Sequence, residues 1–157
     1  MFDVLIYLFE NFPQSTHFPA IPLLARKLTA VGFESDDISA ALKWLTELEN
    51  RNRQDKEMAH LVDAHAIRLY AEREQARLSV ECRSFLHFLE QAGAIDAPLR
   101  EMIVEQALAL GTHVLSLSRF KIIALMVLWR RHPTMESINV LLLDELLVDE
   151  DSTPCLH

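Results

Sequence analysis

Apolar side chains recur at helical spacing along most of the chain, and this pattern predicts a succession of amphipathic helices. The first helix is predicted to run from the first residues to Phe12, because Pro13 cannot continue it. The second begins near Pro19 or Pro22, either of which suits a first helical turn, where no backbone donor is lost. The apolar positions that define these two helices are Phe2, Leu5, Leu8, Phe9 and Phe12, then Leu24, Leu28 and Val31.

A tight turn at Gly32 is predicted between the second and third helices. Glycine readily adopts the left-handed conformation that closes a helix, and Phe33 is the apolar residue expected just beyond it. Ser35 is a suitable N-cap for the third helix, with Asp36 and Asp37 in the favourable first turn. The third helix then carries one apolar stripe, formed by Ile38, Ala41, Leu42, Leu45 and Leu48. Residues 26–48 therefore have a helix-turn-helix signature.

The chain becomes polar and charged at residues 50–63, which predicts a mobile loop. Residues 66–71, AIRLYA, alternate apolar and polar positions and predict a short strand. Three helices followed by a strand resemble a winged-helix unit. The segment that would pair with this strand stays open, with residues 58–62 as one choice.

Helical patterns resume after this strand. A fourth helix is predicted over residues 72–92, ended by Gly93, and Asp96 is the N-cap expected for a fifth. The sixth helix, residues 119–131, is apolar on all sides and should be the most buried element. A last helix is predicted over residues 136–148. The turn chemistry of Gly32 and Ser35 recurs at Gly93 and Asp96, although the wider pattern does not repeat.

These elements predict an all-α protein, mainly helical with at most a short β wing. Its N-terminal part, residues 1–71, is expected to be a winged-helix-like helix-turn-helix unit. This unit would pack on a C-terminal helical bundle, residues 72–150. An acidic and polar tail, residues 151–157, follows the bundle.

The composition changes the meaning of the helix-turn-helix signature. The net charge is -8 and the isoelectric point is about 5.3, so the surface as a whole repels nucleic acid.

The two cysteines, Cys82 and Cys155, are too few for a disulfide framework and are expected to be reduced thiols. Residues 1–12 lack the basic start of a signal peptide, and residues 122–129 are too short to cross a bilayer. We therefore expect a soluble, cytoplasmic protein without membrane contact.

The sequence contains no recognisable catalytic or metal-binding motif. The histidines do not stand at the three- or four-residue spacing of ligands on one helix, and there is no Cys-x-x-Cys pair. Cys82 lies on an apolar face, which opposes the lowered thiol pKa that a nucleophile needs. Glu101 and Glu105 share a helical face without a nearby partner in sequence, as in a solvated surface. We expect neither enzymatic activity nor a cofactor.

A protein-binding role is the favoured prediction. The candidate contact residues on the third helix are Asp37, Lys43, Trp44 and Glu47. Asp144 and Glu145 are the candidates on the last helix, because residues 134–157 contain acids but no lysine or arginine and favour a basic partner. The many leucines of this helix also leave a homo-oligomer open. The sequence does not identify the partner.

The alternative prediction is a nucleic-acid-associated regulator. It would dock through basic residues of the loop and wing that follow the third helix: Arg51, Arg53, Lys56 and Arg68. A third hypothesis is a small-ligand pocket beneath the sixth helix.

Several blocks of the sequence together resemble the Smg family of bacterial proteins. The blocks are MFDVLIYLFENF, GFESDDISAALKWLTEL, IRLYAEREQARLSVECRSFLHFLEQAGAID, REMIVEQALAL and the LH ending, and they extend over nearly the whole chain. The resemblance implies a bacterial protein of about this size in a family with no established activity. The neighbouring genes of this family hint at nucleic-acid metabolism by association. No functional residue is defined for the family, so the resemblance assigns none here.

Overall fold

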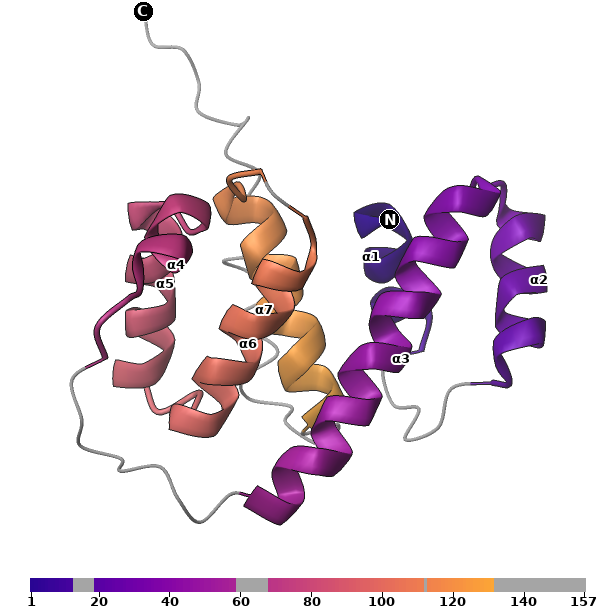
Figure 1. Cartoon of the computed structure of the whole chain (residues 1–157). Helices are drawn as coiled ribbons and strands as arrows, with labels where there is room; N and C mark the ends of the chain where they lie inside the picture. Colours follow the sequence, from indigo (N-terminus) through magenta and orange to yellow (C-terminus); the bar gives the residue numbers. More distant parts are fainter. Residues whose placement is uncertain (13–18, 59–67, 112, 132–157) are drawn as a thin grey trace, which may run out of the picture. The chain divides into compact units, whose positions relative to one another are not determined.

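The computed structural model describes residues 1–12, 19–58, 68–111 and 113–131, with side chains of residues 55–58 left aside (Figure 1). Within these residues every regular element is a helix, which confirms the all-α prediction. The helices are α1 (Phe2–Asn11), α2 (Ile21–Val31), α3 (Ser35–Met58), α4 (Glu72–Arg77), α5 (Val80–Gln91), α6 (Ala97–Ala109) and α7 (Leu117–Arg131). The predicted helix at 136–148 and the tail lie outside the described residues. No described helix has the length and hydrophobicity needed to cross a membrane.

The chain divides into two compact units by its internal contacts. Unit 1 comprises Met1–Val62 and Met126–Thr134, and unit 2 comprises Asp63–Leu125 and Met135–His157. Helices α1, α2 and α3 therefore belong to unit 1, whereas α4, α5 and α6 belong to unit 2. Helix α7 contributes its first part to unit 2 and its last part to unit 1. The boundaries predicted at 71/72 and 150/151 stay a prediction.

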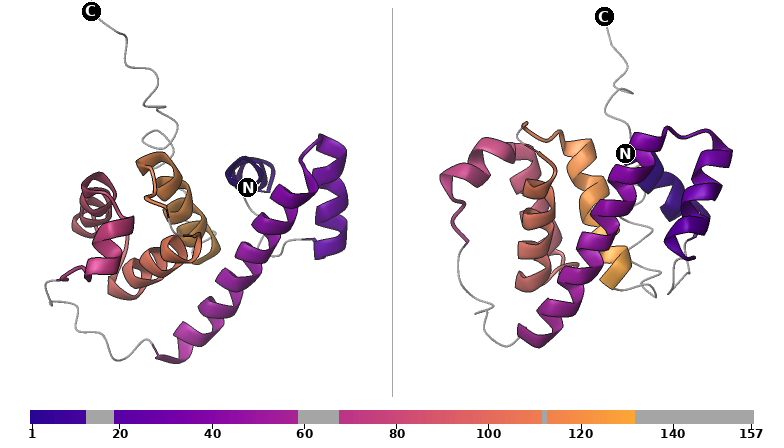
Figure 2. Two further views of the ribbon diagram at one scale, coloured as in Figure 1. Left: turned by 45° about the horizontal axis from the view of Figure 1, so that its top comes forward. Right: turned by 45° about the vertical axis from the view of Figure 1, so that its right-hand side comes forward.

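Helix α3 is the central element of unit 1, because α1 and α2 both pack against it (Figure 2). The turn at Gly32 follows the prediction. Gly32 has a φ of 110°, and its N–H and that of Phe33 both donate to the Leu28 carbonyl, at 3.3 and 3.2 Å. Leu24 and Leu28 form the buried side of α2. Tyr7 of α1 and Phe33 meet edge to face, with ring centroids 5.5 Å apart.

Helix α3 differs from the prediction at both ends. It continues to Met58, so the loop predicted from residue 50 is wrong for residues 50–58. The Asn, Arg, Gln, Lys and Glu residues there are polar but compatible with a solvated helix, and most are good helix formers. At the start, the Glu34 carbonyl accepts the first helical hydrogen bond, from the Ile38 N–H at 3.0 Å. The cap is therefore at Glu34, one residue before the predicted Ser35.

Unit 2 corrects two further predictions. Residues 68–71 form no strand, and Leu69 is 87% exposed, so the predicted wing is wrong for the described part of 66–71. The fourth predicted helix is divided into α4 and α5. Leu78 between them forms an isolated bridge with Leu115, and Ser79 caps α5 by accepting a hydrogen bond from the Cys82 N–H. The backbone pairing of Leu78 with Leu115 and the N-cap at Ser79 therefore divide a segment whose apolar spacing predicts a single helix.

The remaining turns of unit 2 follow the sequence. Gly93 has a φ of 71° after α5, and Asp96 caps α6 by accepting from the Leu99 N–H at 2.9 Å. The buried guanidinium of Arg77 donates to the carbonyls of Leu108 at 2.8 Å and His113 at 3.3 Å. Arg77 thus satisfies the Leu108 carbonyl in the last turn of α6, where helix carbonyls lack backbone partners, and the His113 carbonyl beyond the helix.

Helix α7 contains the longest run of consecutive buried residues among the described helices. Seven consecutive residues, Ile123 to Trp129, have exposed fractions of 7% or less. Two turns of helix point side chains in every direction, so α7 is covered on all sides along this stretch. Trp129 meets Phe9 of α1 edge to face within unit 1, with centroids 5.5 Å apart.

Gln106 of α6 places a polar amide side chain at a buried position of the helix. Its side chain is fully buried, and among the described residues neither its nitrogen nor its oxygen has a hydrogen-bond partner. An unsatisfied buried polar group costs about 1–3 kcal/mol.

We predict that Gln106→Met raises the free energy of unfolding by about 1 kcal/mol, because it keeps the length of the side chain and removes the unpaired amide. Urea unfolding of the full chain measures this change. The matched control is Gln91→Met on the exposed end of α5, expected to change stability by less than about 0.5 kcal/mol. A clear loss of stability in Gln106→Met alone would show that the amide is hydrogen-bonded in solution.

Candidate interaction surfaces

The sequence-predicted residues of α3 divide into exposed and buried positions. Lys43 and Glu47 are exposed, and Asp37 is half exposed. The carboxylate of Asp37 accepts a hydrogen bond from the N-terminal ammonium of Met1 at 2.5 Å. Trp44 is only 3% exposed, so its side chain belongs to the core of unit 1. The Trp44 ring lies inward because it directly precedes Leu45 and follows Ala41 by three residues, inside the buried face of the helix.

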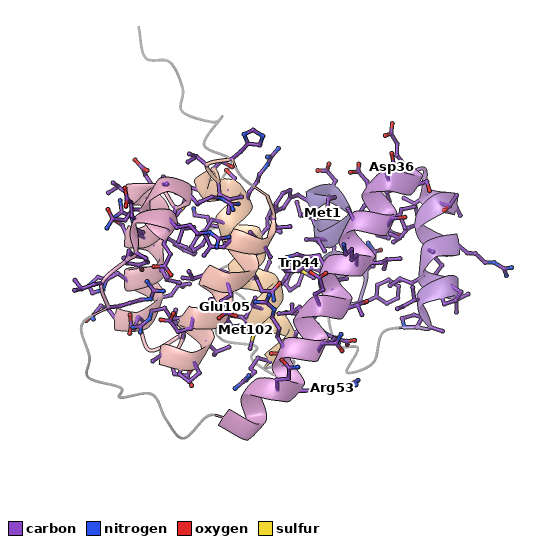
Figure 3. All side chains as sticks on the ribbon, viewed as in Figure 1. Met1, Asp36, Trp44, Arg53, Met102 and Glu105 are labelled. Carbon is purple, nitrogen blue, oxygen red and sulfur yellow. The ribbon has the colours of Figure 1, made fainter. Side chains whose placement is uncertain are left out.

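The exposed side of α3 forms one continuous line of residues, which we call the α3 stripe. Its members are spaced alternately by four and three residues, so they lie on one face of the helix. They are Asp36, Ala40, Lys43, Glu47, Asn50 and Gln54. Asp36 points away from the helix bundle in Figure 3. Exposed Glu34 and Arg53 lie close to its two ends.

The carboxyl-terminal end of α3 borders a shallow polar hollow in unit 1. The hollow has a volume of about 140 Å³ and is lined by Glu49, Asn52, Arg53 and Arg130. Arg130 of α7 forms an ion pair with Glu49, and burial lowers the pKa of its guanidinium. The structure thus adds Arg130 to the surroundings of Arg53, which sequence spacing alone could not reveal. The side chain of Lys56 lies outside the described residues, as do Asp144 and Glu145.

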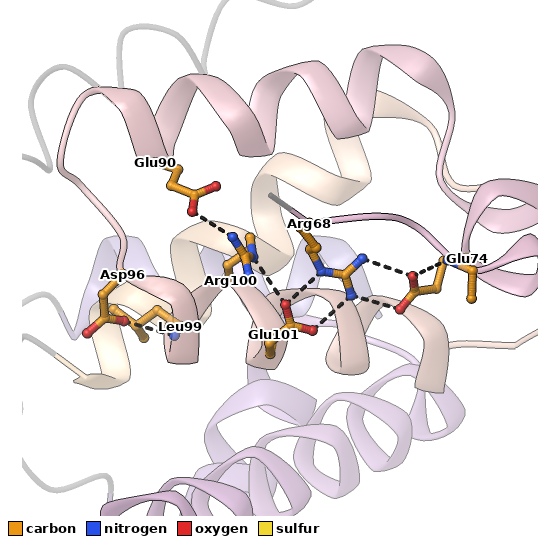
Figure 4. Close-up of polar contacts among 8 residues, drawn as sticks. Arg68, Glu74, Glu90, Asp96, Leu99, Arg100 and Glu101 are labelled. Carbon is orange, nitrogen blue, oxygen red and sulfur yellow. Dashed lines mark hydrogen bonds and ion pairs between the residues drawn. The ribbon is translucent and has the colours of Figure 1, made fainter. Parts of the chain in front are cut away.

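Arg68 is positioned differently from the other basic candidates. It belongs to an ionic cluster in unit 2, the Arg68 network, formed by Arg68, Glu74, Glu90, Arg100 and Glu101 (Figure 4). Its guanidinium donates to both oxygens of Glu74 at 2.8 and 2.9 Å. It also donates to both oxygens of Glu101 at 2.6 and 2.8 Å. Such paired, parallel hydrogen bonds are the strongest form of arginine–carboxylate contact.

The network continues from Glu101 across α6 to α5. Arg100 donates to Glu101 at 3.1 Å and to Glu90 at 2.6 Å, so carboxylates and guanidiniums alternate along the cluster. Glu74 also accepts a hydrogen bond from the Ala71 N–H at 2.8 Å, at the start of α4. The network therefore joins the segment before α4 to α4, α5 and α6. Arg68 further lies over the Tyr70 ring, 4.5 Å from its centroid.

Hydrogen bonding and burial together set the charge states in the network. The hydrogen bonds of Glu74, and next those of Glu101, raise the pKa of Arg68. In return, hydrogen bonding to Arg68 lowers the pKa of Glu74 and of Glu101 below the usual glutamate range. All three groups are therefore charged at neutral pH. Because Arg68 already holds two carboxylates, a phosphate would have to displace them to reach it.

The described residues present no group of three or more histidine, cysteine, aspartate or glutamate side chains that could hold a metal ion. Cys82 is fully buried, and burial raises the pKa of its thiol, so the reactive thiolate is disfavoured. Its sulfur lies 3.3 Å from the Ser79 hydroxyl and 3.7 Å from the Leu115 carbonyl. This environment suits a packed core cysteine.

We predict that Arg68→Met destabilises the chain by on the order of 3 kcal/mol, because it leaves two partly buried carboxylates without their shared cation. Arg73→Met is the matched control, since Arg73 is exposed on α4, and it should cost less than about 0.5 kcal/mol. Urea unfolding at about pH 7 measures both variants.

The same variant has a predictable pH dependence. The folded-state pKa of Glu74 and Glu101 is lowered, so their contribution is present above the unfolded pKa of about 4.3 and is lost as the pH falls through the folded value. The difference between wild type and Arg68→Met should therefore shrink on acidification. A difference that is constant from neutral to strongly acidic pH would contradict this role.

Comparison with known proteins establishes the family. A family model described as a protein of unknown function (DUF494) matches residues 1–157. A Protein Smg homolog of Aromatoleum aromaticum is 48% identical over 96% of this chain and 94% of its own length. A homolog from an Azoarcus species is 45% identical over the full length of both chains, and one from Bordetella pertussis is 45% identical over 97% of each. No solved structure has significant similarity to the chain. The chain therefore belongs to the Smg family of bacterial proteins.

Proposed function

We propose that the chain is a non-enzymatic adaptor of the bacterial cytosol that binds a protein partner through the α3 stripe. The observation that carries this proposal is the distribution of charge along an exposed helix face. Glu34, Asp36 and Asp37 gather at the first turn, and Arg53 is exposed near the other end. Between them lie the small Ala40, which lets a partner backbone approach, and then Lys43 and Glu47.

This pattern favours a partner with basic groups opposite the first turn of α3 and an acidic group opposite Arg53. Complementary charges of this kind direct association and exclude wrong partners more than they add affinity. Since Trp44 is buried, it supports the stripe from within the core instead of anchoring the partner. The proposal therefore retains Asp37, Lys43 and Glu47 from the predicted contact set and replaces Trp44 with the neighbouring exposed positions.

We predict that reversing the charge of two stripe residues, Asp36→Lys with Glu47→Lys, removes the partner. Tagged protein would be expressed in its native host, crosslinked and recovered at low salt, and co-purifying proteins would be quantified. At least one protein captured by the wild type should fall about tenfold or more with the variant, a change that corresponds to about 1.4 kcal/mol of binding free energy.

Glu10→Lys is the matched control for this experiment. Glu10 is exposed on α1 in the same unit, so the substitution changes charge without altering α3. It should retain the captured protein. Equal capture by the wild type and the α3 variant would refute the use of this stripe.

A second candidate function, docking of nucleic acid, is favoured by the position of Arg53 beside Arg130 at the polar hollow. Arg51 precedes Arg53 on α3, and Arg53 is exposed. The net charge of -8 and the Glu49 carboxylate that lines the hollow both oppose nucleic-acid binding. Arg68, engaged by Glu74 and Glu101, would contribute little to such a surface.

If the second candidate is right, the chain will be retained on immobilised DNA or RNA at about 50 mM salt, where phosphate contacts are strong. Arg51→Ala with Arg53→Ala should then weaken retention and reduce its salt dependence, whereas Arg73→Ala should not. No retention of the wild type at this salt concentration would exclude the function.

A further inference from the structure

Helix α2 has an exposed face that carries basic residues, whereas the chain as a whole is acidic. Only Leu24 and Leu28 of this helix are buried. Its outer face consists of Leu23, Arg26, Lys27 and Ala30, which are spaced as neighbours on one side of a helix. We call these four residues the α2 face. They are separate from the α3 stripe.

The α2 face has its basic pair, Arg26 and Lys27, between Leu23 and Ala30. Leu23 is 48% exposed, and Ile21 and Val31 at the two ends of the helix are 53% and 51% exposed. The ammonium of Lys27 lies 5.5 Å from the centroid of the Phe12 ring while the residue stays exposed. Leu23 and the basic pair are therefore neighbours on one exposed side of the helix, whereas Ile21 and Val31 lie outside the α2 face.

The charge of this region is opposite to that of the whole protein. No aspartate or glutamate occurs between Glu10 and Glu34, although the chain carries a net charge of -8. Arg26 and Lys27 are therefore not balanced by acids of their own segment. A partner that covers the α2 face should supply an acidic pair flanked by apolar residues.

The chain contains a segment with this pattern. Residues 140–148 lie outside the described part of the chain, but their sequence, VLLLDELLV, places Asp144 and Glu145 between two apolar runs. Residues 134–157 contain no lysine or arginine that would oppose the contact. The α2 segment LLARKLTAV has the complementary order, with its basic pair between apolar residues.

We propose that the α2 face binds residues 140–148 of a second copy of this chain. Asp144 and Glu145 would lie opposite Arg26 and Lys27, and the apolar residues on either side would cover Leu23 and Ala30. Contacts of this kind draw their free energy from apolar burial, while the charges fix the register and exclude other partners. The proposal does not depend on the α3 stripe.

The test is self-association of the full chain, measured by sedimentation over a concentration series. The wild type should associate reversibly. Arg26→Glu with Lys27→Glu should weaken the dissociation constant by about tenfold or more, because four like charges then face one another. Asp144→Lys with Glu145→Lys should weaken it similarly, for the same reason. Combining all four substitutions restores opposite charges and should restore association.

Arg73→Glu with Arg119→Glu is the matched control, because both residues are exposed outside the α2 face and the α3 stripe, and the substitutions change the net charge equally and should leave association unchanged. Circular dichroism of each variant confirms that it folds. A wild type that stays monomeric throughout would overturn the proposal. So would a four-residue variant that fails to regain association, because the acidic occupant of the α2 face would then be another segment or another protein.

Discussion

Burial of α7 on all sides is the constraint on which the rest of this structure depends. Ile123 to Trp129 are covered in every direction, and a fully buried aliphatic side chain contributes about 1.5–3 kcal/mol. Leu125 belongs to unit 2 and Met126 to unit 1, yet both lie in one hydrogen-bonded helix. Helix formation is cooperative, so unwinding α7 would remove core residues from both units. Neither unit has a complete apolar interior without its part of this helix.

The basic residues of this fold form two groups: cations that are buried and paired within unit 2, and cations that are exposed on helix surfaces. Arg68 and Arg100 are largely buried and held by carboxylates, and Arg77 satisfies a carbonyl at the end of α6. These cations connect elements within unit 2. Arg26, Lys43 and Arg53 are exposed on helices whose opposite faces are packed. The proposed contact surfaces therefore lie on α2 and α3, and the basic residues with the most hydrogen bonds serve the fold of unit 2.

Local patterns predicted most of the fold, and long-range contacts account for the errors. The Gly32 and Gly93 turns, the Asp96 cap and the burial of α7 follow from neighbouring residues. The division of α4 from α5 depends on the pairing of Leu78 with Leu115, which helical periodicity does not encode. The alternating pattern of residues 66–71 predicts a wing for Arg68, because its partner Glu101 is 33 positions away in sequence and does not enter that pattern. The exposed α3 residues were predictable from spacing, whereas the proximity of Arg130 to Arg53 was not.

Amide hydrogen exchange of the full chain tests the central claim most directly, because it measures local opening along each helix. Amides that open only with global unfolding exchange most slowly. The account predicts that residues 123–129 of α7 are among these slowest amides, together with the buried part of α3 near Leu45 and Leu48. Amides of α2, which is buried only at Leu24 and Leu28, should exchange faster. Rapid exchange throughout α7, while α3 stays protected, would contradict a core built around this helix.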